Sequence, residues 1–157
     1  MAKLIIITCW MAGCAIDTRP PELPRWHQEA VTVCATPEFE DATIAAAAAW
    51  TVGPELVYIG GCGDAQIAVM PSGRPGKGVL GQTSPHLPEY ANVWVYPDRD
   101  GFDLQAVLTH ELGHALGLHD VDYHEATMFR WQGRGDLSAR DISEIDVRMM
   151  EELYEGR

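Results

Sequence analysis

Residues 110–120 constrain this chain more than any other stretch, because they place two histidines, a glutamate and an aspartate at fixed intervals around a glycine. Side chains four residues apart lie on one face of a helix, so His110 and His114 can bind the same metal ion. Glu111 lies beside the first histidine, where the general base of a metal-dependent hydrolase belongs. The pattern therefore predicts a helix that carries a metal site.

Gly117 and Asp120 extend this pattern beyond the helix. Glycine adopts the left-handed conformation that commonly ends a helix, so the chain can reverse at Gly117. Asp120 lies three residues further on, and a carboxylate oxygen is an accepted zinc ligand. His119 is its neighbour and is the alternative third ligand. Three protein ligands leave one position open, which is typical of a catalytic zinc site.

The pattern H-E-x-x-H-x-x-G-x-x-D at residues 110–120 resembles the metzincin metallopeptidases. Residues 110–118 are most similar to the matrixin branch, whereas Asp at position 120 is similar to the snapalysin type. Matrixins have Asp then His where this chain has His119 then Asp120. The resemblance implies that His110, His114 and Asp120 bind one catalytic zinc ion, and that Met128 lies in a tight turn beneath it.

The resemblance also implies an α+β fold of the zincin type. Such a catalytic domain has a small twisted mixed sheet with an edge strand at the cleft, two long helices and a C-terminal helix. Alternating apolar residues and turn signals predict strands at 28–35, 56–59, 65–70, 79–83 and 91–96, with 79–83 as the edge strand. Helices are expected at 38–51, through the metal motif from the cap residue Asp103, and at 137–153 with Ser138 and Asp141 at its start.

The activity implied is that of a zinc-dependent endopeptidase acting on peptide or protein substrates. In that reading Glu111 takes a proton from zinc-activated water during attack on a peptide carbonyl. A non-catalytic metal-binding or peptide-binding lipoprotein with the same fold is the alternative, although a purely structural metal site needs no base at position 111. A structural metal domain would need His119 as a fourth ligand.

Composition argues against one class of partner. The formal net charge is −12 over 157 residues, whereas the phosphates of a nucleic acid need a basic surface. Apolar residues make up 46% of the chain, which is ordinary for one globular domain of this length. We therefore expect one folded domain, no nucleic-acid partner and a monomer.

The first residues predict export. Lys3 precedes a mostly apolar run at 4–12 that is too short to span a bilayer, as in a signal peptide. The run leads to Cys14 through small residues, similar to bacterial lipoprotein signals, whose cysteine is lipidated. We predict a signal peptide at 1–13, a proline-rich tether at 14–27 and the catalytic domain at 28–157. The protein would be anchored by lipid to a bacterial cell envelope, its only membrane contact, or else be secreted.

Cys34 and Cys62 form an even pair in a chain expected to be exported, which predicts a disulfide. Two buried thiols are the alternative. In metzincins the first two strands are parallel neighbours. That arrangement would place both cysteines at strand C-terminal ends, and it makes the bridge geometrically plausible.

Overall fold

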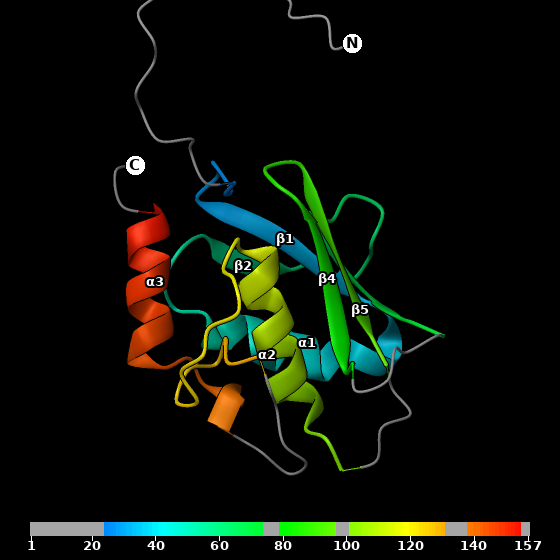
Figure 1. The fold of residues 1–157 in the computed structure, drawn as a ribbon. Helices are drawn as coiled ribbons and strands as arrows, with labels where there is room; N and C mark the ends of the chain where they lie inside the picture. Colours follow the sequence, from blue (N-terminus) through cyan, green and yellow to red (C-terminus); the bar gives the residue numbers. More distant parts are fainter. Residues whose placement is uncertain (1–23, 74–78, 97–100, 131–137, 155–157) are drawn as a thin grey trace, which may run out of the picture.

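The computed structural model describes residues 24–73, 79–96, 101–130 and 138–154, which form a five-stranded sheet and three α-helices (Figure 1). The strands are β1 (Ala30–Ala35), β2 (Glu55–Tyr58), β3 (Ile67–Pro71), β4 (Gly81–His86) and β5 (Tyr90–Val95). The helices are α1 (Glu40–Ala49), α2 (Leu104–Ala115) and α3 (Glu144–Tyr154), with 3-10 turns η1 (Pro37–Phe39) and η2 (Ser138–Arg140). The signal peptide, Cys14 and residues 14–23 of the tether lie outside the described residues.

The sheet is mixed, with strand order β2-β1-β3-β5-β4. The first four of these strands pair in parallel, and β4 pairs antiparallel with β5 at the edge. Alternate residues such as Val31 and Val33 of β1, and Val93 and Val95 of β5, are buried because successive side chains point to opposite faces of a strand. The predicted mixed sheet is confirmed, although its edge strand begins at Gly81 and continues to His86.

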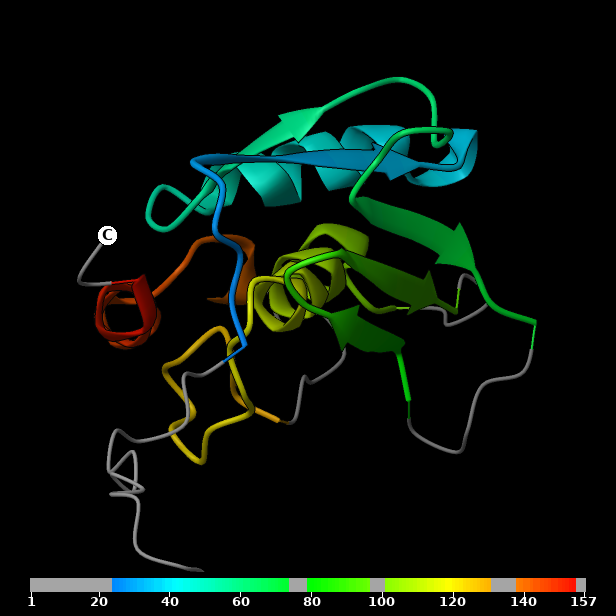
Figure 2. The same ribbon diagram turned by 90° about the horizontal axis from the view of Figure 1, so that it is seen from above.

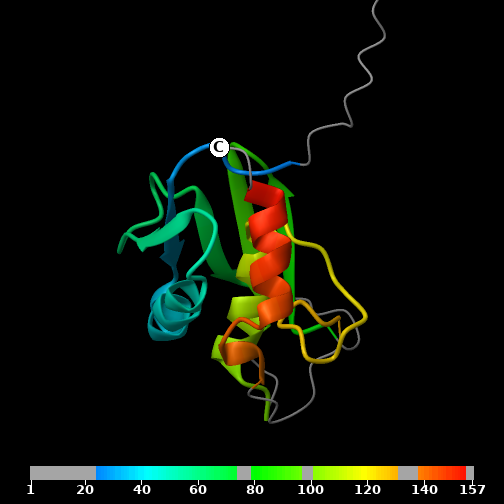
Figure 3. The same cartoon turned by 90° about the vertical axis from the view of Figure 1, so that its left-hand side faces the viewer.

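Helices α1 and α2 cover one face of the sheet. Helix α1 contacts β1 and β2, α2 contacts β4 and β5, and the two helices contact each other. Figure 2 shows α2 between the sheet and the chain that follows it, and Figure 3 shows α3 on the side away from α1. The core between these layers is apolar and includes Phe39, Trp50, Leu108, Leu112, Leu116 and Met150. The α+β class is therefore confirmed.

The folded part begins before residue 28. Trp26, which the tether prediction assigned to a linker, is fully buried, and its ring donates a hydrogen bond to the Ala115 carbonyl at 2.9 Å. Its main-chain N–H donates to the Tyr154 hydroxyl at 3.2 Å, and that hydroxyl donates to the Leu116 carbonyl at 2.8 Å. This first stretch, blue in Figure 2, therefore joins the C-terminal ends of α2 and α3.

The predicted last helix starts too early. Residues 138–140 form the 3-10 turn η2, and α3 begins only at Glu144. The hydroxyl of Ser143, rather than Ser138, accepts hydrogen bonds from the main-chain N–H groups of Ile145 (3.2 Å) and Asp146 (3.3 Å). The cap of this helix is therefore Ser143, in the Ser-x-x-Asp pattern at residues 143–146, and not Ser138 in the pattern at residues 138–141.

A disulfide joins Cys34 at the end of β1 to Cys62 in the loop after β2, as expected. It connects two parallel neighbouring strands at their C-terminal ends. Within the described ranges, no helix combines the length and the apolar character needed to cross a lipid bilayer.

Candidate metal centre

Helix α2 presents the metal motif, and its first turn is fixed by Asp103. The Asp103 carboxylate accepts a hydrogen bond from the Ala106 N–H at 2.9 Å, which confirms the predicted N-cap. The same carboxylate pairs with Arg140 of η2 through both of its oxygens. The hydrogen bond from Arg140 lowers the pKa of the Asp103 carboxyl. The start of α2 is thus held to the segment that precedes α3.

The other end of α2 turns at Gly117. Gly117 has a φ of +103°, and its N–H donates to the His114 carbonyl at 3.0 Å. The next N–H, of Leu118, donates to the Gly113 carbonyl at 3.0 Å, which completes a Schellman motif. A Cβ at position 117 would also lie 2.8 Å from the Pro24 carbonyl oxygen. Glycine is therefore required here, and the reversal directs Asp120 back toward the helix.

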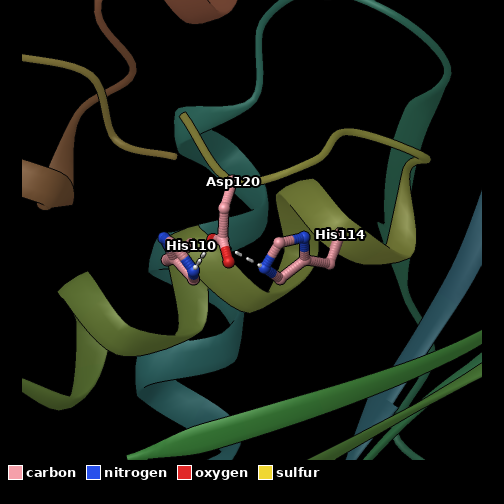
Figure 4. A group of neighbouring side chains, drawn as sticks. All are labelled: His110, His114 and Asp120. Carbon is pink, nitrogen blue, oxygen red and sulfur yellow. Dashed lines mark ion pairs between the residues drawn. The ribbon is translucent and has the colours of Figure 1, made fainter. Parts of the chain in front are cut away.

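His110, His114 and Asp120 come together as Figure 4 shows, with the carboxylate between the two rings. The Asp120 Oδ1 atom lies 3.3 Å from Nε2 of His110 and 3.3 Å from Nε2 of His114. One ligand atom from each residue lies within 4.8 Å of the others. His119 is exposed, lies in the same cleft and is not part of this group.

The opposite nitrogen of each ring has a main-chain acceptor. His110 Nδ1 lies 2.8 Å from the Thr127 carbonyl, and His114 Nδ1 lies 2.9 Å from the Leu118 carbonyl. A carbonyl can only accept, so each Nδ1 donates its proton to it, and Nε2 is the ring atom that each histidine directs at Asp120. Two nitrogens and one carboxylate oxygen are a donor set that fits zinc.

Glu111 lies on the buried side of α2 beside this group, with 6% of its surface exposed. The Thr83 hydroxyl on β4 lies 2.7 Å from its Oε2 and 3.0 Å from its main-chain oxygen. Burial raises the pKa of the Glu111 carboxyl, and the hydrogen bond from Thr83 opposes that rise. Nothing in the sequence pattern indicated Thr83, because the contact depends on how β4 packs against α2.

Met128 lies fully buried beneath the motif. A Cβ built at Gly113, between the two histidines, would collide with the Met128 sulfur and the Trp50 ring. The turn that carries Met128 is closed by a hydrogen bond from the Phe129 N–H to the Ala126 carbonyl at 3.1 Å. Met128 therefore packs directly against the helix that carries the histidines.

Asp146 of α3 holds this turn and is a residue that the sequence analysis missed. Its fully buried carboxylate accepts hydrogen bonds from the main-chain N–H groups of Thr127 (2.8 Å) and Met128 (3.1 Å). It also accepts from the Ser143 N–H at 2.9 Å and the Ser143 hydroxyl at 2.5 Å. The signal was present as a second Ser-x-x-Asp pattern at residues 143–146.

A cleft of about 700 Å³ lies over the three clustered side chains and Glu111. Its lining includes Gly81 and Thr83 of β4, together with Phe129 and Arg130, which follow Met128. The Arg130 side chain pairs with Asp122 at 2.9 Å. The cleft therefore runs between the edge strand and the loop after the metal motif.

Comparison with known proteins identifies relatives of this arrangement. Macrophage metalloelastase of Oryctolagus cuniculus is 39% identical over 82 residues, which cover 52% of this chain and 17% of that protein. Matrilysin of Felis catus is 35% identical over 84 residues, covering 54% and 31% of the two chains. Matrix metalloproteinase-27 of Tupaia belangeri is 38% identical over 82 residues, covering 52% and 15%. The matched stretches thus cover less than a third of each relative.

A family model covers much more of the chain. The model described as Matrixin matches residues 33–155, which include the second half of β1, the other four strands, the metal motif and all of α3. The match agrees with the resemblance of residues 110–118 to matrixins, and it extends over the sheet and both long helices. The chain belongs to the matrixin family.

Proposed function

We propose that this protein is a zinc-dependent endopeptidase in which His110, His114 and Asp120 hold one zinc ion. The observation that carries the proposal is the convergence of two Nε2 atoms on the Asp120 carboxylate, 3.3 Å from each, with both Nδ1 atoms next to carbonyl acceptors. Membership of the matrixin family and the relatives named metalloelastase and matrilysin support the same activity.

The zinc ion, when bound, would supply Lewis-acid polarisation of a peptide carbonyl and lower the pKa of a bound water molecule to about 7. Glu111 is the general base in this proposal: its carboxylate accepts the proton of the attacking water and later delivers it to the leaving amine. Its small exposed surface of 6% keeps bulk water from competing for the carboxylate. Met128 supports the helix from below and has no chemical role.

The substrate would bind along β4 as an extended strand. The Leu80 carbonyl accepts from the Tyr96 N–H, so the alternation of an antiparallel pair directs the main-chain groups of residues 81 and 83 away from β5. Residues 81 and 83 also line the cleft. A peptide lying in the cleft could therefore pair with this free edge through main-chain hydrogen bonds.

Cleavage of a quenched fluorescent peptide tests the proposal. The purified protein should contain one zinc ion per chain, cleave the peptide, and lose the activity on chelation. Glu111→Gln should retain the zinc ion and lose activity by at least about a hundredfold, because it removes the base and leaves the ligands. A folded, zinc-loaded protein that cleaves no peptide or casein would contradict the enzyme assignment and favour a metal-binding or peptide-binding protein.

The proposal places the catalytic domain at residues 24–157 and keeps the predicted export signal at 1–13 with lipidation at Cys14. Mass spectrometry of the membrane fraction would test the lipid directly. A mature chain that retains Met1, or that begins elsewhere without lipid on Cys14, would contradict it.

A further inference from the structure

Two residues of β4 contact the Glu111 side chain from the same strand face. Residues 81 and 83 are separated by one position, so both point toward α2. A Cβ at Gly81 would lie 2.6 Å from Glu111 Cγ and 2.7 Å from its Oε1, so the carboxylate occupies the space that glycine leaves. The Thr83 hydroxyl lies 2.7 Å from Oε2 on the other side. The edge strand thus approaches both oxygens of the carboxylate.

We propose that Thr83 is a positioning residue that holds the Glu111 carboxylate in the orientation from which it acts as a base. This inference rests on the proposed peptidase function. Thr83 reaches the proposed catalytic machinery only through Glu111, and it is therefore not itself a catalytic residue.

The contact fits this role because the Thr83 hydroxyl lies within hydrogen-bond distance of two oxygens of Glu111. The hydroxyl lies 2.7 Å from the Glu111 carboxylate and 3.0 Å from the Glu111 main-chain oxygen. Its single proton can be donated to only one of these acceptors at a time, and a charged carboxylate is the stronger acceptor. A hydroxyl also serves both forms of the base, since it donates to a charged carboxylate and accepts from a protonated one.

A buried carboxylate needs such a partner. With 6% of its surface exposed, Glu111 has little access to water, and an unpaired carboxylate in that setting could rotate toward solvent or toward the two histidines. Either movement would take the base out of position without removing it. The expected loss on removing the hydroxyl is therefore a loss in kcat.

The matched substitutions are Thr83→Val, which removes the hydroxyl at nearly constant shape, and Thr83→Ser, which keeps it. Thr83→Val should lower kcat by about tenfold to a hundredfold, in line with the loss of a hydrogen bond to a charged group. The KM should change by less than about threefold, because the main-chain groups of residue 83 that would pair with a peptide remain. Thr83→Ser should recover most of the lost kcat.

Zinc content and unfolding curves of both variants identify any loss caused by misfolding. Wild-type kcat in Thr83→Val would overturn the proposal, as would Thr83→Ser that is impaired as strongly as Thr83→Val. A rise in KM at constant kcat would also overturn it, since that result assigns residue 83 to substrate binding alone.

A second measurement separates this inference from the proposed activity. Unfolding of Thr83→Val, Glu111→Ala and the double variant in urea forms a cycle that needs no turnover. Non-additive effects support the contact, and additive effects overturn it. Should the wild-type protein cleave nothing, the proposed function fails together with the positioning role, while non-additivity would still establish that Thr83 holds the Glu111 side chain.

Discussion

Replacing Asp146 with Asn tests whether one buried carboxylate holds the loop beneath the proposed metal centre. Three of its hydrogen bonds reach Oδ2, from the Thr127 N–H at 2.8 Å, the Ser143 N–H at 2.9 Å and the Ser143 hydroxyl at 2.5 Å. The fourth reaches Oδ1 from the Met128 N–H at 3.1 Å. Asparagine has the same shape and a single acceptor oxygen, so it cannot satisfy both sides.

The magnitude follows from that geometry. With the amide oxygen at the Oδ2 position, the amide nitrogen faces the Met128 N–H, and that buried donor loses its acceptor at about 1–3 kcal/mol. The three remaining bonds change from charge-assisted to neutral, and neutral bonds are roughly half as strong. We expect the free energy of unfolding to fall by about 3–5 kcal/mol, a large fraction of the roughly 5–15 kcal/mol that stabilises a domain.

Urea unfolding followed by tryptophan fluorescence measures this loss, with Asp141→Asn as the matched control. Asp141 is exposed, and its main-chain carbonyl rather than its carboxylate accepts the Thr127 hydroxyl at 3.0 Å. The control should therefore change stability by less than about 0.5 kcal/mol. Equal losses in both variants would refute the reasoning, and so would wild-type stability of Asp146→Asn.

The same variant has a functional readout. The Thr127 carbonyl is the acceptor next to His110 Nδ1, so loosening this turn disturbs the support of a proposed metal ligand. Loss of such a support lowers metal affinity by about 10-fold to 100-fold. Competition with a chromogenic chelator should show weaker zinc binding by Asp146→Asn and unchanged binding by Asp141→Asn.

Two further predictions concern the ends of the metal motif. Asp120→Ala should abolish stoichiometric zinc binding, measured by elemental analysis, whereas His119→Ala should retain the ion; the opposite pattern would make His119 the ligand. Arg140→Gln should raise the pKa of Asp103 toward its ordinary value of 3.8, since the hydrogen bond from Arg140 lowers it. A carboxyl group whose pKa is lowered by folding stabilises the fold above pH about 4, and this stabilisation is lost as the pH falls through the folded-state pKa. The variant should therefore unfold at a lower urea concentration than the wild type at about pH 6, and this difference should shrink at about pH 2.

The grouping of His110, His114 and Asp120 could be predicted from sequence because their positions depend on local geometry. The spacing of His110 and His114 is a property of any helix, and Gly117 supplies the reversal that returns Asp120. The Asp103 cap is equally local, since its partner Ala106 is three residues away.

The predictions for the start of the last helix and for Trp26 were wrong for two reasons. A local sequence pattern occurs twice in the first case, and the hydrogen-bond partner is distant in the sequence in the second. Ser-x-x-Asp stands at 138–141 and again at 143–146, and only the second aspartate also receives the N–H groups of Thr127 and Met128. Trp26 follows a proline-rich stretch and so resembled a linker. Its acceptor, the Ala115 carbonyl, is 89 residues away and is available only because α2 ends there.

The Thr83–Glu111 contact is intermediate between the local and the distant contacts. The sequence indicates the register of β4, but it does not indicate that Thr83 meets Glu111. Pro85 has no N–H, so in an edge strand it belongs at a position that does not donate to the neighbour. The Leu80–Tyr96 hydrogen bond places residues 81, 83 and 85 in that class. A slip of one residue would require Pro85 to donate to β5 and would turn Gln82 or Ser84 toward Glu111 in place of Thr83. The proline that is compatible with only this register therefore also favours Thr83 as the side chain that contacts Glu111.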